Sequence, residues 1–106
     1  NTQGEGGIAI GKMAGESNQG ANAIAIGNEA GQTNQGKDSI AIGNDAGGFG
    51  QANNSIILNA TGVGLGTNAS DTFNVKPVRN AGALGLPGGF EQVAYNPTTG
   101  EFVYYS

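Results

Sequence analysis

A repeat of sixteen residues in the first half of the chain constrains the fold more than any other feature of this 106-residue sequence. Large apolar residues occupy two of its phases: Ile8, Ile24, Ile40 and Ile56, followed two positions later by Ile10, Ile26, Ile42 and Leu58. A third phase holds Gln3, Gln19, Gln35 and Gln51. A fixed period of this length is typical of stacked identical units. We therefore treat residues 1–62 as one repetitive block.

Each copy of the repeat combines a short strand with turns. The I-A-I-G segment alternates large and small residues, which is the period of a β-strand, and it is too short for a helix. The N-x-A-G-x-x-N-Q-G stretch that follows is rich in Gly and Asn, residues that accept a positive φ. We expect a short second strand around Ala30 and turns at six glycines: Gly11, Gly15, Gly27, Gly31, Gly43 and Gly47.

Copies of such a unit stack into a parallel β-roll or β-solenoid of sixteen-residue coils. The sequence predicts that the large residues Ile8, Ile10, Ile24, Ile26, Ile40, Ile42, Ile56 and Leu58 form the core, and that the flat Ala face receives a neighbouring chain. Two isoleucines per coil bury too little apolar surface to offset the entropy of ordering sixteen residues, so we expect an obligate oligomer. A disordered Gly-rich linker is the alternative, but a linker has no reason to keep isoleucine in register.

The sequence changes character after the repeats. Residues 63–70 form a transition, and residues 71–106 hold six of the seven Phe and Tyr residues. A solenoid needs a cap over the exposed end of its core, and this segment is predicted to be a β-strand and hairpin cap.

Three parts of the cap can be predicted from their residues. Thr72 to Val78 alternates apolar and polar residues and contains Pro77, which cannot donate to a ladder, so we expect an edge strand. Val93 to Tyr104 is predicted to be a hairpin that turns at Asn96–Gly100. Asn80 to Gly89 is predicted to be a Gly-rich loop.

Composition excludes several classes of function. The net charge of −4, with only four Lys and Arg, lacks the basic footprint that nucleic-acid binding requires. The chain has no His or Cys, and so lacks the usual zinc ligands, thiol nucleophiles and imidazole bases. No apolar run is long enough to span a bilayer. We therefore expect no enzyme activity, no cofactor, no metal, no nucleic-acid partner and no membrane insertion.

The octet GQTNQGKD, Gly31 to Asp38, has the spacing of a phosphate-binding loop. Its Lys is absent from the neighbouring copies, its last position carries Asp38 where a hydroxyl is needed, and no helix follows it. We interpret the octet as a turn between coils, with Lys37 and Asp38 as a surface ion pair of small energetic effect.

Two further groups of polar residues can be interpreted either as functional sites or as ordinary surface residues. The N-glycosylation pattern occurs three times, at Asn53–Ser55, Asn59–Thr61 and Asn68–Ser70, and Asn54 lies within the first of these. Glycosylation at these sites would require a eukaryotic secretory host. Glu29 and Asp45 share one phase of neighbouring coils. They could form a weak calcium site, but we favour solvated surface charges.

The repeat SIAIGNDAG, Ser39 to Gly47, resembles the head repeats of YadA-like trimeric adhesins. That resemblance implies a homotrimer of left-handed parallel β-rolls.

The tail resembles a second family. DTFNVKPVRN, Asp71 to Asn80, and YNPTTGEFVY, Tyr95 to Tyr104, are similar to the segment upstream of the intramolecular chaperone domain in phage tail fibres, tailspikes and large-virus fibre proteins. In that family the chaperone trimerises the fibre and then cleaves itself off, commonly between Ser and Asp. The resemblance implies that Ser106 is a maturation end and that Asp follows it in the precursor. A stop codon directly after Ser106 in the encoding gene would exclude this.

The sequence thus predicts a structural fibre protein, namely a homotrimeric viral or phage fibre segment that is extracellular, in a virion fibre or at a cell surface. Contact with a host-surface glycan or protein fits this role. One alternative is a bacterial trimeric adhesin head that binds matrix or glycan. Another is the subunit of a self-assembling extracellular filament, in which residues 101–106 pair with the next subunit by β-addition.

Overall fold

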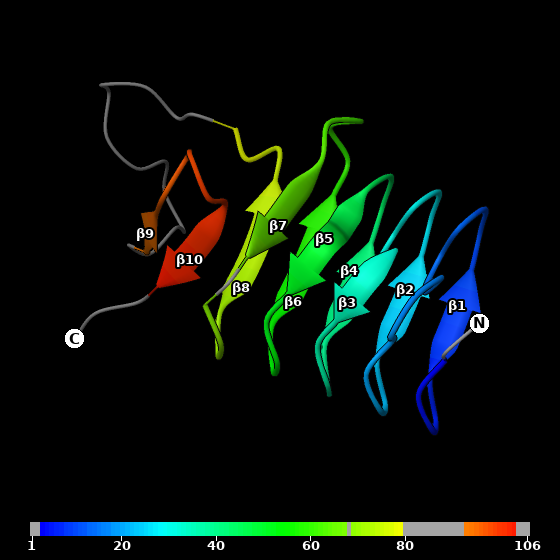
Figure 1. The fold of residues 1–106 in the computed structure, drawn as a ribbon. Coiled ribbons are helices and arrows are strands. Elements are labelled where there is room, and N and C mark those ends of the chain that lie inside the picture. The colour runs from blue at the N-terminus through cyan, green and yellow to red at the C-terminus, as the bar shows by residue number, and fades with distance from the viewer. Residues whose placement is uncertain (1–2, 68, 80–92, 104–106) are drawn as a thin grey trace, which may run out of the picture.

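The structure is a computed structural model that describes residues 3–67, 69–79 and 93–103, and these residues form strands and turns without any helix. The coils stack side by side along the long axis of the molecule, from the N-terminus at one end to the C-terminal hairpin at the other (Figure 1). The strands are β1 (Ile8–Ile10), β2 (Ile24–Ile26), β3 (Thr33–Gln35), β4 (Ile40–Ile42), β5 (Ala46–Gln51), β6 (Ile56–Asn59), β7 (Leu65–Thr67), β8 (Phe73–Lys76), β9 (Ala94–Tyr95) and β10 (Glu101–Val103).

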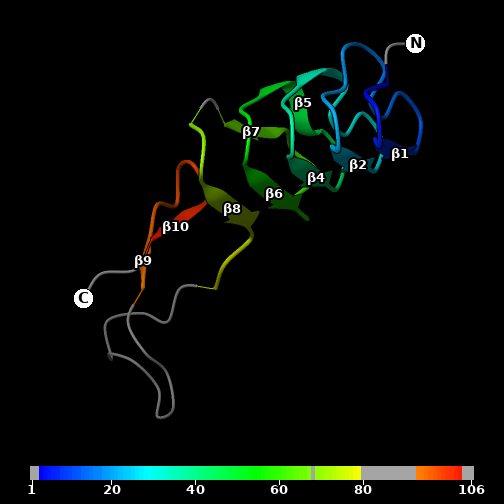
Figure 2. The same cartoon turned by 90° about the horizontal axis from the view of Figure 1, so that it is seen from below.

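Two sheets form the walls of the solenoid. One has seven strands in the order β1-β2-β4-β6-β8-β10-β9, and the other has three in the order β3-β5-β7. Seen from below, the three-stranded sheet lies on the opposite side of the coils from β2, β4 and β6 (Figure 2). Each strand of the repeat pairs in parallel with its counterpart one coil away, as in Ile8 with Ile24 and Ile24 with Ile40. The predicted β-solenoid with sixteen-residue coils is confirmed.

The prediction of which face fills the coil is wrong. The small residues point inward, and Ala25, Ala41 and Ile57 at the centres of β2, β4 and β6 are fully buried. The eight large residues assigned to the core lie on the outer face instead: Ile8, Ile10, Ile42 and Ile56 are exposed, and Ile24, Ile26, Ile40 and Leu58 are half-buried. A coil of only sixteen residues brings its two sheets close together, so alanine fills the interior of the regular coils, and Ile57 takes this position only in β6, next to the cap.

The six glycines predicted to turn the chain all have a positive φ; five of them lie in turns or bends, whereas Gly47 lies within β5. Gly11, Gly27 and Gly43 end the first strand of their coils with φ of 125°, 130° and 117°. Gly15, Gly31 and Gly47 have φ between 54° and 60°. Their spacing of sixteen residues makes each coil turn at the same places.

The second strand lies later than predicted in the coil of Ala30, whereas in the next coil β5 begins at the equivalent Ala46. Ala30 is in a turn, and the strand of that coil is β3, from Thr33 to Gln35. The range assigned to the transition, residues 63–70, contains β7, which pairs with β5 and so continues the second sheet.

The cap is a strand and a hairpin, as predicted, but its first strand is not at an edge. β8 pairs in parallel with β6 and antiparallel with β10, so it lies inside the seven-stranded sheet. Pro77 directly follows the last residue of β8, where its missing N–H removes no ladder bond. The turn of the hairpin lies between β9 and β10, as expected, whereas the loop predicted at Asn80–Gly89 lies outside the described residues.

Candidate interaction surface

The outer face of the seven-stranded sheet is a continuous apolar surface, which we call the isoleucine face. It consists of the outward-facing large residues of the I-A-I segments in β1, β2 and β4 and of Ile56 and Leu58 in β6. Ile8 is 45 % exposed and Ile10 58 %, and in later coils Ile42 is 38 % and Ile56 36 % exposed. Parallel in-register pairing places each of these residues beside its counterpart in the next coil. Large contiguous apolar patches on a folded chain indicate an interaction surface.

No charged residue belongs to the four strands that form this face. Near the cap the face carries a hollow of about 370 Å³, whose lining includes the apolar residues Ile42, Leu58, Val75 and Pro77 and also Lys76. The outer face of these four uncharged strands fits a partner with the same apolar character better than it fits water.

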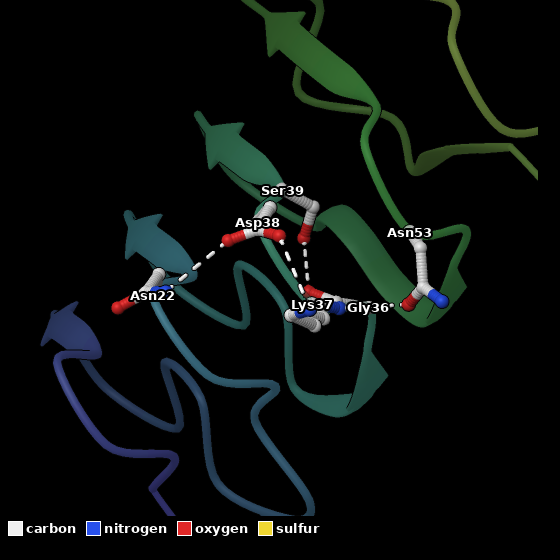
Figure 3. Close-up of polar contacts among 6 residues, drawn as sticks. All are labelled: Asn22, Gly36, Lys37, Asp38, Ser39 and Asn53. Atoms are coloured by element: carbon white, nitrogen blue, oxygen red, sulfur yellow. Dashed lines mark hydrogen bonds and ion pairs between the residues drawn. The ribbon is translucent and has the colours of Figure 1, made fainter.

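The corner that resembles a phosphate-binding loop is shown in Figure 3. The backbone N–H of Lys37 donates to Oδ1 of Asn53 over 2.8 Å, and the N–H of Asp38 donates to the carbonyl of Ala21 over 3.0 Å. The hydroxyl of Ser39 donates to the carbonyl of Gly36 over 2.6 Å. A phosphate cradle needs free backbone N–H groups, and those of Lys37 and Asp38 are bonded to neighbouring coils.

Side chains of this corner also tie the coils together. Nδ2 of Asn22 donates to Oδ1 of Asp38 over 3.2 Å, one coil along the stack. Nζ of Lys37 lies 3.8 Å from Oδ2 of Asp38, and both side chains are largely exposed. The pair therefore adds little to stability, and the octet is a corner of a coil with positive φ at Asp38.

The two acidic residues considered for calcium do not assemble a metal site. Both Glu29 and Asp45 occupy corners with positive φ, and Oε1 of Glu29 accepts a hydrogen bond from Nδ2 of Asn28. Within the described ranges, no group of three or more His, Cys, Asp or Glu side chains could hold a metal ion.

The three glycosylation patterns differ in their surroundings. Asn53 is exposed, and its Oδ1 is the acceptor for Lys37. Asn59 is only 5 % exposed, and its Nδ2 donates to the carbonyls of Asn44 and Val63 over 3.0 and 2.7 Å. A glycan on that nitrogen would require the coil to open. Asn68 lies outside the described residues.

The sequence shows a repeated glutamine whose structural role the pattern analysis did not assign. Gln19, Gln35 and Gln51 are buried, and their amides form a ladder along the stack, with Nε2–Oε1 distances of 3.1 and 3.2 Å. Their shared phase was a sufficient signal, because a repeated Gln at an inward position must pair with its own copies.

Comparison of the chain with protein-family models, curated proteins and solved structures found no match. No helix long and apolar enough to cross a membrane occurs in the part of the chain that the structure describes.

Proposed function

We propose that this chain is a structural segment of a homotrimeric extracellular fibre, of the kind built by viruses and phages, whose role is to project and space the parts of the fibre and to contact a host surface. The observation that carries the proposal is the isoleucine face. Three chains packed around a common axis would bury this face on all of them, and the parallel stack would supply the elongated shape.

The physical argument starts from the interior of a single coil. Alanine, glycine, serine and the glutamine ladder fill most of it, so one chain buries few large apolar side chains: the buried apolar residues are mostly alanines, together with Ile57 and Leu65. The larger apolar surface lies outside, where burial would contribute about 25 cal/mol for each Å² removed from water. Stability is therefore expected to come from association.

Two other functions remain as alternatives. A bacterial trimeric adhesin head would use the same apolar contact between chains and bind matrix or glycan on its outer surface. A self-assembling filament would instead join chains end to end. A precursor in which a chaperone domain follows the present chain favours the viral fibre, discrete trimers without such a precursor favour the adhesin, and long polymers favour the filament.

The mass of the folded chain in solution tests the proposal. Sedimentation equilibrium is expected to give the mass of three 10.5 kDa chains. Ile26→Asp, in the middle of the isoleucine face, is expected to break this particle into monomers or unfolded chains. The matched control, Phe49→Asp, places the same charge on the opposite sheet at a side chain that is 79 % exposed, and it is expected to leave the mass unchanged. A well-folded monomer would exclude the proposed trimer.

A further inference from the structure

The second sheet carries one residue that departs from the repeat. Ser17 pairs with Thr33, and Thr33 pairs with Phe49, so a phenylalanine stands where the preceding coils have small hydroxyl side chains. Phe49 is 79 % exposed. The position tolerates a small polar residue in the other coils, so the ring of Phe49 is not required for coil packing.

Two hollows flank this ring. The first, of about 430 Å³, lies between Phe49 and the hairpin of the cap, and its lining includes Gly66, Thr99 and Glu101. The second, of about 310 Å³, lies on the other side of the ring and includes Asp45. Phe49 and Gly66 belong to both linings, so the two hollows adjoin the same ring.

Gly66 keeps the floor of both hollows open. Most glycines in the coils leave no room for a side chain, but the nearest atom to a Cβ at Gly66 would be the carbonyl oxygen of Gly50 at 3.8 Å. Gly66 is also absent from the residues with a positive φ. Neither backbone conformation nor packing requires glycine here, and a side chain would project into the hollows.

The polar groups around the ring can both accept and donate hydrogen bonds. Glu101 lines the first hollow and Asp45 the second, and their carboxylates can accept hydrogen bonds. Oγ1 of Thr99 accepts from the N–H of Glu101 over 3.2 Å, which leaves its hydroxyl hydrogen free to donate. Among the described residues, no Lys or Arg lines either hollow, so an anionic ligand would meet the carboxylates of Asp45 and Glu101 there.

We propose that Phe49, together with the hollows on its two sides, is a binding site for an uncharged oligosaccharide. A sugar ring has an apolar face of C–H groups that packs on an aromatic ring, whose face carries partial negative charge. Its hydroxyls donate to carboxylates and accept from a threonine hydroxyl, whereas a cationic peptide would use the acceptors alone. The combination of an apolar platform with a few convergent polar groups is typical of small-molecule sites.

Phe49 lies on the sheet opposite the isoleucine face, so its ring stays accessible when that face is covered (Figure 2). This inference deepens the host contact of the proposed function and rests on it for biological context, but the site is formed within one chain. A trimer would present three copies, and such multivalency raises the avidity of a weak site.

Titration of the isotopically labelled full chain, followed by amide resonances, tests the site. The probes are neutral oligosaccharides of glucose, galactose, mannose and N-acetylglucosamine, with a sialylated oligosaccharide and an oligolysine peptide as charged probes. At least one neutral probe is expected to shift Phe49, Gly66 and Glu101, with millimolar affinity. Phe49→Thr, which restores the residue of the preceding coil, is expected to weaken binding roughly tenfold or more.

Two further variants separate binding from folding. Gly66→Thr is expected to fill the hollows and abolish the shifts while the chain stays folded. Val63→Thr removes another exposed apolar side chain, 72 % exposed and outside both hollows, and is expected to bind as the original chain does. The proposal is overturned if no neutral probe shifts Phe49, if Phe49→Thr binds equally well, or if only a charged probe binds. A folded monomer that still binds the sugar would refute the proposed trimer but would support this binding site.

Discussion

At the scale of single residues, the interior of the solenoid depends on amide groups as much as on apolar ones. Gln35 is 2 % exposed, and its Nε2 donates to the carbonyl of Ile24 over 2.8 Å and to Oε1 of Gln51 over 3.2 Å. Its own Oε1 accepts from Nε2 of Gln19 over 3.1 Å. The side chain thereby spans the narrow coil and joins three coils through groups that water cannot reach.

Gln35→Ala is expected to lower the free energy of unfolding by about 2 to 4 kcal/mol, because it leaves buried partners unpaired and opens a cavity. Chemical denaturation followed by circular dichroism measures this loss. The matched control is Gln3→Ala, in the same phase but at the exposed end of the stack, where we expect a loss of about 1 kcal/mol or less. Equal losses in the two variants would show that the ladder contributes nothing.

Gly27 and Gly66 form a second contrast between residues of one type. Gly27 has a φ of 130°, and a Cβ there would lie 2.7 Å from the carbonyl oxygen of Gly43, whereas Gly66 has neither constraint. Gly27→Ala is expected to destabilise the chain by about 2 kcal/mol or more, since the corner cannot accept a side chain. Gly66→Ala is expected to stay within about 0.5 kcal/mol of the original chain. Thermal unfolding distinguishes them, and an unaffected Gly27→Ala would contradict the coil geometry.

At the scale of elements, alternation alone could not say which face of the I-A-I strands points inward. The period predicted the strands, their register and the corner glycines. The usual rule that large residues are buried then gave the wrong face, because it does not include the width of the coil. Ile57 is buried in β6, where the path becomes irregular: the register of β5 with β7 shifts between Ala46 and Gln51, and Ile56 pairs with Phe73 one residue beyond the repeat.

Ala25→Leu tests the width of the coil. Ala25 is fully buried. A Cβ built on Gly31, across the coil, would lie 3.1 Å from the Cβ of Ala25. A leucine there has no space, so we expect a loss of about 3 kcal/mol or more, or failure to fold. Ile24→Leu, on the outer face of the same strand, is expected to change stability far less. Circular dichroism during thermal unfolding measures both, and tolerance of Ala25→Leu would show that the interior can widen.

The sequence predicted that the cap consists of a strand and a hairpin, but not which strands they pair with. Alternation and turn residues indicated a strand at Phe73 and a hairpin around Asn96–Gly100, and both are present. The position of β8 inside the sheet depends on long-range contacts: the rings of Phe73 and Phe102 stack with centroids 5.7 Å apart, and the hydroxyl of Tyr95 donates to the carbonyl of Val75 over 2.9 Å. The edge-strand prediction was based on Pro77 alone, and a proline in one segment does not show which distant residues contact it.

At the scale of the whole molecule, the two ends of the stack differ. The C-terminal end is closed by β10, which pairs antiparallel with β8 and ends the parallel series with a short hairpin. At the other end, β1 has only β2 as a neighbour among the described strands. The bonds from Ile8 N to Ala23 O and from Gly27 N to Ile10 O face β2, so the N–H of Ala9 points to the open edge.

A chain truncated after Ser70 would lose the cap and leave β6 as a second open edge. Because β6 and β1 occupy the same place in their coils, the β6 edge of one copy is expected to pair with the β1 edge of another, and such head-to-tail contacts do not close. Light scattering should then show particles that grow with concentration, whereas the full chain stays discrete. Adding Ala9→Pro to the truncated chain removes the N–H at the β1 edge and should restore discrete particles. A truncated chain that keeps its strand signal and a constant mass would contradict the role of the hairpin as the stop of the stack.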